Sequence, residues 1–442
     1  MWRSLLLIGL ASGTAVAAAP AQPGAQPVSA SSQVDTGIVI ADLRRILRSN
    51  YVLPEVRPKL DAALESGLKS GRYKVADPAE LVNRINADLN AVAHDKHLGI
   101  KFDPAQQAEL ASRPPGSGAD DAPPTADDVR RASSINHGIQ SLRMLPGNVR
   151  YMEYNGFVWA GPKTAEALDN AMRFLRDGDA IVIDLRQNGG GSPEAVQYLV
   201  SHFLEADRKI VTFYMRGDPA EPLSTISSLP AGRMVGKPLY VLTSSHSASA
   251  AEEFVGHVAG FKIGELIGET TAGAGYRNEF FPVSGGYVIS VSVGRAVLAS
   301  TGKDWEGIGI APTTKTDPDK ALDLAQVHAW RAIAAKASVD QRRILEANAA
   351  LLDAKLNPVP TALPLTSYAG TYGERSLTVA GDRLEWRRGD GPKLQLVAVG
   401  PNEFSFDQDP LSRVVFAVAG SNVTGFKMVR ADGSTVEARR QP

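Results

Sequence analysis

The chain has no cysteine in its 442 residues. This excludes disulfide bonds, cysteine nucleophiles, thiolate metal sites and lipid attachment through a cysteine. A chain of this length without cross-links relies on burial of apolar side chains for its stability. An excess of charge is also missing, because 47 Lys and Arg residues face 48 Asp and Glu residues. The sequence therefore gives no electrostatic reason to expect nucleic acid or an acidic membrane surface as a partner.

Several catalytic motifs are absent as well. The sequence has no His-Glu-x-x-His helix and no Gly-x-Ser-x-Gly elbow. Its nearest approach to a phosphate loop, "GRMVGKP", is one residue short and has proline where Ser or Thr would bind magnesium. We therefore expect neither a metal nor a cofactor.

The first residues have the pattern of a secretory leader. In residues 1–19 one basic residue, Arg3, precedes an apolar run and then small residues in an Ala-x-Ala-like arrangement. The run is too short for a lasting membrane span. Residues 20–33 form a polar, proline-containing linker. We predict a signal peptide and export to the periplasm without a membrane anchor.

Hydrophobic patterning divides the rest of the chain into four parts. Helical spacing predicts an N-terminal helical domain over 34–112, and a stretch rich in Pro, Gly and Asp predicts a flexible loop over 113–133. The region 134–358 carries α/β signals and two trailing helices. Short strands between Gly, Asp and Asn turns predict a small β domain over 359–442.

Two strand-then-helix units stand out in the central region. "DAIVIDLR" is an apolar run of strand length, and "QNGGGSPEAVQYLVSHFL" follows it as a turn and a helix. "PLYVLTSS" and "ASAAEEFVGHVAGF" repeat this order. Such units predict a mostly parallel sheet covered by helices. A hairpin turning at 284–286 and helices over 318–336 and 339–355 are expected after them.

The serine-rich turn after the second strand is the main chemical feature. A serine hydroxyl needs a nearby base and backbone N–H groups that can stabilise an oxyanion. Ser247 and Ser249 both suit the first turn of a helix, where the dipole is positive. The glycine run "NGGGS" follows the preceding strand, and reactive clefts in parallel sheets lie at the carboxyl ends of strands. Both segments are therefore expected at one edge.

Four motifs occur in a specific order: "DLRQNGGG", "TSSHSASAAEEF", "LIGETTAGAG" and "WEGIGIAPT". Over residues 135 to 320 this set resembles the serine peptidase family that includes tail-specific proteases, tricorn core protease and interphotoreceptor retinoid-binding protein. The resemblance implies a ClpP/crotonase-like α/β fold of stacked sheets and helices. It also implies that Ser249, within "SASAAE", is the nucleophile of an acyl-transfer reaction on a peptide or protein substrate.

The branches of this family differ in their general base. Tail-specific proteases carry a lysine just before the last glycine of "GETTAGAG", where this chain has Ala274. The tricorn-like and retinoid-binding-like branch takes a histidine from the region before the glycine run and a glutamate from the region after the hairpin. The resemblance implies His97 as general base and Glu306 as its orienting group. The serine that precedes the tricorn histidine is replaced by Lys96 here.

The remaining site residues also follow from the resemblance. It implies the backbone N–H groups of Gly190 and Ala250 as oxyanion donors, with Gly189 or Gly191 as alternatives to Gly190. We expect Gly189, Gly191 and Gly273 to bind substrate. The segment after "KFDP" is too short for the PDZ module of tail-specific proteases, so recognition of a free substrate C-terminus through such a module is not expected.

Other interpretations of these residues stay open. Ser247 suits a helix cap, and His246 is near Ser249 in sequence but on the same turn, which rarely lets an imidazole point at the hydroxyl. Glu306 beside a hairpin could simply be solvated. The alternative function is a non-catalytic protein that binds an apolar ligand or a peptide on the same fold, although such a protein has no use for Ser249, His97 and Glu306 together.

Overall fold

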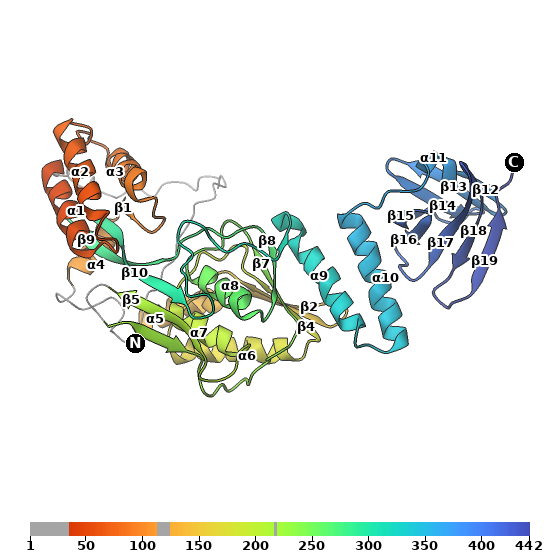
Figure 1. The fold of residues 1–442 in the computed structure, drawn as a ribbon, viewed down its shortest axis with the longest axis horizontal. Coiled ribbons are helices and arrows are strands. Elements are labelled where there is room, and N and C mark those ends of the chain that lie inside the picture. The colour runs from red at the N-terminus through yellow and green to blue at the C-terminus, as the bar shows by residue number, and fades with distance from the viewer. Residues whose placement is uncertain (1–34, 113–123, 216–218) are drawn as a thin grey trace, which may run out of the picture.

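The structure is a computed structural model, and it describes residues 35–112, 124–215 and 219–442. The predicted signal peptide (1–19) and linker (20–33) lie outside these residues. None of the described helices is long and apolar enough to cross a membrane. Figure 1 shows N-terminal helices on one side, a central α/β region, a pair of helices beside it and a C-terminal β region at the other end.

A six-stranded sheet lies in the central region, with its strands in the order β11-β8-β7-β4-β3-β2. Neighbouring strands from β11 to β3 are parallel, and only β2 is antiparallel to its neighbour. The strands are β2 (Ile139–Leu145), β3 (Val149–Tyr154), β4 (Ala180–Asp184), β7 (Leu239–Thr243), β8 (Glu265–Gly268) and β11 (Thr314–Lys315). The predicted mostly parallel sheet is confirmed.

Helices cover both faces of this sheet because its strands are apolar on both sides. On β4, Ile181 and Ile183 pack against one set of helices, and Ala180 and Val182 pack against the other. The first set is α6 (Pro162–Arg176), α7 (Pro193–Ser201) and α8 (Ala250–Phe261); the second is α9 (Pro318–Ala334) and α10 (Val339–Leu356). The bounds of α9 and α10 lie close to the two helices predicted there.

A second sheet is antiparallel and contains the predicted hairpin. β9 (Tyr276–Val283) pairs with β10 (Tyr287–Leu298), and the turn between them falls at 284–286 as expected. β10 also pairs with β1 (Gly99–Phe102) and with β5 (Lys209–Met215), which in turn pairs with β6 (Glu221–Ser224).

The N-terminal helices do not pack as an independent unit. They are α1 (Thr36–Asn50), α2 (Arg57–Lys69) and α3 (Pro78–Ala93). Their buried side chains form one core with Val283, Ile289 and Val291 of the β9–β10 hairpin. The segment predicted as a helical domain also contains β1, which pairs with β10. The hairpin supplies the apolar surface that three short helices alone lack.

The segment between β1 and β2 is more regular than its composition suggests. α4 (Pro104–Ala111) comes first, and α5 (Ala126–Ser134) lies in what was expected to be a loop. α5 begins with a capping box, in which Thr125 and Asp128 exchange hydrogen bonds with each other's backbone. A 3₁₀ turn, η1 (Asn136–Gly138), joins it to β2. The prediction of a flexible loop over 113–133 is therefore wrong for the residues of α5, and its part 113–123 lies outside the described residues.

The C-terminal region is a meander of eight antiparallel strands in the order β12 to β19. Its elements are α11 (Leu365–Tyr368), β12 (Gly370–Tyr372), β13 (Arg375–Ala380), β14 (Arg383–Arg388), β15 (Leu394–Gly400), β16 (Glu403–Phe406), β17 (Arg413–Ala419), β18 (Asn422–Val429) and β19 (Thr435–Arg439). The Gln441 N–H donates to the Thr371 carbonyl at 2.9 Å and links the two edges. Its core is aromatic, with Tyr368, Trp386 and Phe416 among the buried rings. The predicted small C-terminal β domain is confirmed.

Candidate active site

Ser249 lies in the connection between β7 and α8, as its N-cap residue. Its backbone has φ +56° and ψ −120°, a conformation that residues with a side chain rarely adopt. Strained backbone of this kind persists only where the surroundings hold it, and it concentrates at functional sites. A sharp strand-to-helix turn is also a known way of exposing a nucleophilic hydroxyl.

Ser247, the neighbouring candidate, is fully buried and has a structural role. Its hydroxyl donates to the Leu185 carbonyl at 2.8 Å and accepts the Ser244 N–H at 3.1 Å. Leu185 precedes the glycine run, so Ser247 links the glycine loop to the serine turn. It does not cap the helix.

The glycine loop passes very close to Ser249. A Cβ atom on Gly190 would lie 2.7 Å from the Ser249 Cβ and 2.8 Å from the Ala248 carbonyl oxygen, and the φ of Gly190 is +109°. Only glycine fits this position without displacing the serine turn. However, the Gly190 N–H donates to Asn188 Oδ1 at 2.9 Å. This hydrogen bond engages the Gly190 N–H, which the family resemblance implied as an oxyanion donor.

Three other backbone N–H groups lie at the cavity beside Ser249. Gly189, Gly191 and Ala250 line the cavity beside Ser249, and within the described residues none of their N–H groups makes a hydrogen bond. Ala250 is the first residue of α8, where N–H groups have no partner inside the helix. The positive end of the helix dipole adds to the attraction for an anion.

Glu252 holds the serine turn to the loop that follows β8. Its side chain is fully buried and accepts four hydrogen bonds. The donors are Ser249 N–H at 2.9 Å, Ala274 N–H at 2.7 Å, Gly273 N–H at 2.6 Å and Thr271 Oγ1 at 2.6 Å. Gly273, predicted to bind substrate, therefore has its N–H engaged within the protein. Ala274, at the position of the lysine of tail-specific proteases, lines the cavity instead.

His97 is buried in the connection between α3 and β1. Its N–H donates to Asp95 Oδ1 at 2.8 Å, and its ring Nδ1 has no hydrogen-bond partner among the described residues. Burial lowers the pKa of the His97 imidazole below its usual 6.5, and the Asp95 charge offsets part of this shift. The imidazole is therefore neutral at pH 7 and can accept a proton.

Glu306 is held by the loop that follows Gly273. Its Oε2 accepts the N–H groups of Gly275 at 2.5 Å and Tyr276 at 2.8 Å, while Oε1 is buried without a partner in the described structure. Burial raises the pKa of the Glu306 carboxyl to about 7, and the Asp95 charge acts in the same direction. The two N–H groups oppose this shift without cancelling it.

The loop 271–276 contacts Glu306 directly and lies beside the segments that carry Ser249 and His97. Ala274 and Gly275 line the Ser249 cavity, Gly275 binds Glu306, and the ammonium of Lys96, next to His97, binds the Ala272 carbonyl. Within the described chain no hydrogen bond joins Ser249, His97 and Glu306 to one another. Catalytic hydrogen bonds are often long before substrate binds, so the missing hydrogen bonds do not contradict the predicted roles.

His246 lies elsewhere. Together with Ser245 it is exposed and borders a separate polar cavity of about 550 Å³, on the other side of the serine turn. The cavity that contains Ser249 is much smaller, about 50 Å³, and His246 is not in its wall. The geometry therefore gives His246 no access to the Ser249 hydroxyl through that cavity.

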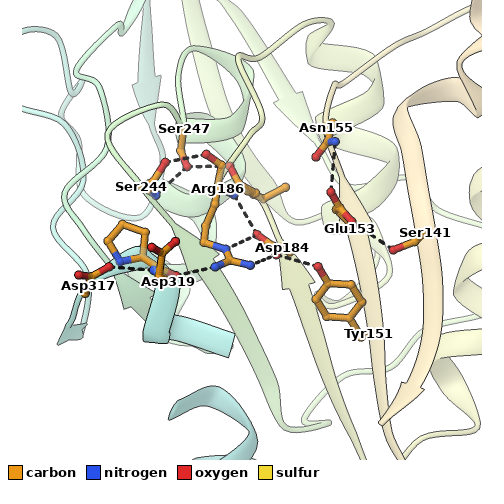
Figure 2. A network of polar contacts seen from close by, with 12 residues as sticks. Ser141, Tyr151, Glu153, Asn155, Asp184, Arg186, Ser244, Ser247, Asp317 and Asp319 are labelled. Carbon is orange, nitrogen blue, oxygen red and sulfur yellow. Dashed lines mark hydrogen bonds and ion pairs between the residues drawn. The ribbon is translucent and has the colours of Figure 1, made fainter. Parts of the chain in front are cut away.

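A partly buried ion pair between Asp184 and Arg186 holds the start of the glycine loop (Figure 2). Asp184, the last residue of β4, accepts hydrogen bonds from Tyr151 Oη at 2.7 Å and from Arg186 Nε at 2.9 Å and Nη2 at 2.6 Å. The Arg186 carbonyl in turn accepts the Ser244 hydroxyl at 2.6 Å. With Ser247, this network fixes the glycine loop against the serine turn.

A metal site has no support in the part of the chain that the structure describes. No group of three or more His, Asp or Glu side chains there could hold a metal ion.

Two family models match the chain. "Peptidase family S41" matches residues 148–316, and "N-terminal domain of Peptidase_S41 in eukaryotic IRBP" matches residues 31–134. The chain belongs to peptidase family S41. The predicted resemblance to this peptidase family is thus confirmed, and the match of residues 31–134 extends it beyond the stretch 135–320 on which it was based. The two S41 models together include the segments that carry His97, Ser249 and Glu306.

Individual S41 relatives match over shorter stretches. The carboxy-terminal processing protease CtpB of Bacillus subtilis is 29% identical over 153 residues, which is 34% of this chain and 31% of CtpB. The chain thus spans about a third of that curated relative. Among solved structures, the photosystem II D1 C-terminal processing protease is 17% identical, with a TM-score of 0.40 over 66% of this chain and 94% of that one. Tricorn protease is 12% identical, with a TM-score of 0.39 over 64% of this chain and 34% of tricorn protease.

Several residues of this S41 site were missed from the sequence. Asn188 is an ordinary polar residue until its tertiary contacts are known. Phe213 and Trp305 line the Ser249 cavity from segments far apart in the chain. The acidic residue two positions before His97 was a usable local signal, because an aspartate commonly accepts the backbone N–H two residues on.

Proposed function

We propose that the protein is a serine peptidase in which Ser249 is the nucleophile, His97 the general base and Glu306 the group that orients the imidazole. The observation that carries the proposal is the strained turn of Ser249 at the start of α8, facing a cavity bordered by unengaged N–H groups. Membership of family S41 supports the same reaction class. Peptides or proteins are the substrates.

The proposed reaction proceeds through an acyl-enzyme. The Ser249 hydroxyl attacks a peptide carbonyl while the neutral His97 imidazole takes its proton, and the N–H groups of Ala250 and of Gly189 or Gly191 stabilise the oxyanion. Gly190 contributes space rather than a donor. The protonated His97 then gives its proton to the leaving amine, and water releases the acyl group by the reverse sequence. Glu306 stabilises the imidazolium that forms in both steps.

The alternative, a carrier of an apolar ligand, fits the site less well. Ligand pockets of drug-sized molecules occupy roughly 300–1,000 Å³. The cavity at Ser249 is about 50 Å³, and the interior of the C-terminal β region is filled with aromatic side chains. A cavity of about 780 Å³ bordered by Phe416 and Phe426 on the C-terminal β region falls in this range, but Ser249 does not line it.

A fluorophosphonate probe tests the proposal. We expect the wild-type protein to be labelled, Ser249→Ala and His97→Ala to lose labelling, and Ser245→Ala to retain it. Ser245 is the matched control because it is an exposed serine on the same turn. Absence of labelling in the folded wild-type protein would sink the proposal, and loss of labelling in His246→Ala would overturn the choice of base.

We also propose that the protein is exported to the periplasm by its N-terminal leader. The apolar run and small residues of 1–19 support this. Fractionation of a bacterial host that expresses the full chain tests it. A shortened mature protein in the periplasmic fraction is expected, and a full-length protein confined to the cytoplasm would contradict the proposal.

A further inference from the structure

The short turn between α3 and β1 carries a second acidic residue, Asp95, beside His97. The Asp95 side chain is only 4% exposed, and its Oδ1 accepts the His97 N–H at 2.8 Å. The Asp95 backbone carbonyl also accepts the Leu98 N–H at 3.3 Å. Asp95 therefore fixes the backbone on which the imidazole is carried.

The second carboxylate oxygen of Asp95 is not used by the fold. Oδ2 is buried and makes no hydrogen bond among the described residues, and the same holds for His97 Nδ1. A buried carboxylate oxygen without a donor costs free energy, and a positive charge formed nearby lowers this cost. Proton transfer from Ser249 to the imidazole creates such a charge on the residue whose backbone Asp95 already holds.

The Asp95 charge acts on both His97 and Glu306. Burial lowers the pKa of the His97 imidazole, and the Asp95 charge raises it. Burial and the same charge raise the pKa of the Glu306 carboxyl to about 7, so roughly half of Glu306 is protonated at pH 7. Because the charged Asp95 helps Glu306 to keep its proton, the negative charge at neutral pH lies more with Asp95.

Other titratable groups face Asp95 or Glu306 from three further elements. They are Tyr51 at the C-cap of α1, Glu252 of α8 and Tyr276 of β9. The pKa values of the two tyrosine hydroxyls are raised, chiefly by burial, so both hydroxyls are neutral at pH 7. Lys96, the neighbour of Asp95 in the chain, is exposed, and its ammonium binds the Ala272 carbonyl. Asp95 is thus the carboxylate whose charge opposes the effect of burial on the His97 ring.

We propose, on the basis of the proposed function, that Asp95 is a positioning residue for the general base His97. Its Oδ1 holds the His97 backbone in place, and its charge stabilises the imidazolium that forms when Ser249 gives up its proton. Asp95 and Glu306 act together, and Asp95 supplies the negative charge at pH values where Glu306 is partly protonated.

Uncharged variants of Asp95 separate its charge from its hydrogen bond. Asp95→Asn keeps an oxygen that can accept the His97 N–H and loses the charge. Asp95→Ser is the second variant, because a serine hydroxyl also accepts a backbone N–H two residues on. Asp77→Asn is the matched control. Asp77 is an exposed N-cap residue of α3, and asparagine caps a helix as well as aspartate does.

Two measurements follow the imidazole. The pH dependence of the rate of fluorophosphonate labelling reports the pKa of the base in the free protein. NMR titration of the histidine ring C–H signals, assigned with His97→Ala, reports the same pKa without any reaction. Loss of the Asp95 charge makes the imidazolium less stable, so both midpoints should move to lower pH in Asp95→Asn. The labelling rate above the midpoint should fall by roughly tenfold, because a weaker base takes the Ser249 proton less readily.

The direction of the shift distinguishes the charge from a loosened turn. An opened turn lets water reach His97, which would raise its pKa toward 6.5 and move the midpoints to higher pH. Lower midpoints in both uncharged variants, or in whichever of them folds, with none in Asp77→Asn, support the proposal.

The remaining outcomes separate this proposal from the proposed function. If the wild-type protein is labelled but the midpoints are unchanged or move to higher pH in the uncharged variants, the role of Asp95 is overturned and the peptidase proposal stands. An equal shift in Asp77→Asn also overturns it. If the probe labels nothing in the folded wild-type protein, the proposed function fails, and the role of Asp95 fails with it.

Discussion

Replacing Glu252 by glutamine should loosen the serine turn and lower the stability of the central region together. The carboxylate accepts hydrogen bonds on both oxygens, from Ser249 and Ala274 on Oε2 and from Thr271 and Gly273 on Oε1. A glutamine side chain keeps only one acceptor oxygen. Its NH₂ group must therefore face one of these two pairs of donors.

The four hydrogen-bond donors around residue 252 show which orientation of the glutamine side chain destabilises the protein less. With the NH₂ on the Oε1 side, the Thr271 oxygen can accept from the amide although its own proton loses an acceptor, and one backbone N–H, that of Gly273, is left unpaired. In the other orientation, both Ser249 and Ala274 lose their acceptor. One buried unpaired N–H costs about 1–3 kcal/mol, and loss of charge raises the total to roughly 2–5 kcal/mol. At 2–4 °C per kcal/mol, the melting temperature should fall by roughly 4–20 °C.

Thermal melting and the rate of fluorophosphonate labelling measure the two effects. Both should fall in Glu252→Gln, and the labelling rate should stay low at temperatures where the variant is fully folded. Glu346→Gln is the matched control, because Glu346 is an exposed residue of α10. A Glu252→Gln protein that melts and labels like the wild type would refute the idea that this carboxylate holds the turn.

Three further substitutions test the site. Gly190→Ala should abolish labelling because its Cβ would lie 2.7 Å from the Ser249 Cβ; Gly302→Ala, with φ +68° and open space around it, is the control for backbone strain alone. Glu306, with a pKa of about 7 against 4.5 when unfolded, binds its proton more tightly in the native state, so stability should fall as pH rises between about 4.5 and 7. Urea titrations at several pH values should show this fall weakened in Glu306→Gln, and an unchanged profile would contradict the assignment. Arg186→Met should cost roughly 1–3 kcal/mol, because Asp184 loses its charged partner and keeps only the hydrogen bonds from Tyr151 Oη and the backbone N–H of residue 186; the double variant with Asp184→Asn should melt at a higher temperature than Arg186→Met, and failure to do so would argue against the ion pair.

Much of the central fold was predictable because its signals are local. The apolar runs that become β4 and β7 are followed at once by helix-starting residues, and the Gly285–Gly286 turn marks the hairpin. α5 was missed because its capping box, Thr125 to Asp128, adjoins a stretch rich in Pro, Gly and Asp. The shared core of the N-terminal helices and the hairpin could not be predicted, since it joins segments some two hundred residues apart.

The sequence was enough to predict the turn that carries Ser249. It was not enough to predict which backbone N–H groups are free to stabilise an oxyanion. Ser249 lies at a strand-to-helix junction, as its sequence neighbours indicated. Which glycine offers a free N–H depends on the side chain of Asn188, whose acceptor engages Gly190. The contacts of Asp95 and Glu252 depend on tertiary packing in the same way.

The common core of α1–α3 and the β9–β10 hairpin implies an order in which the proposed active site forms during synthesis. His97 follows the first part of this core in the chain, whereas the hairpin is synthesised almost two hundred residues later. A chain that has not yet delivered residues 283–293 lacks the surface on which the His97 segment packs. The proposed active site, which also needs Glu306, would thus form only after the hairpin has been synthesised, and a shorter nascent chain would carry Ser249 without a packed His97 segment.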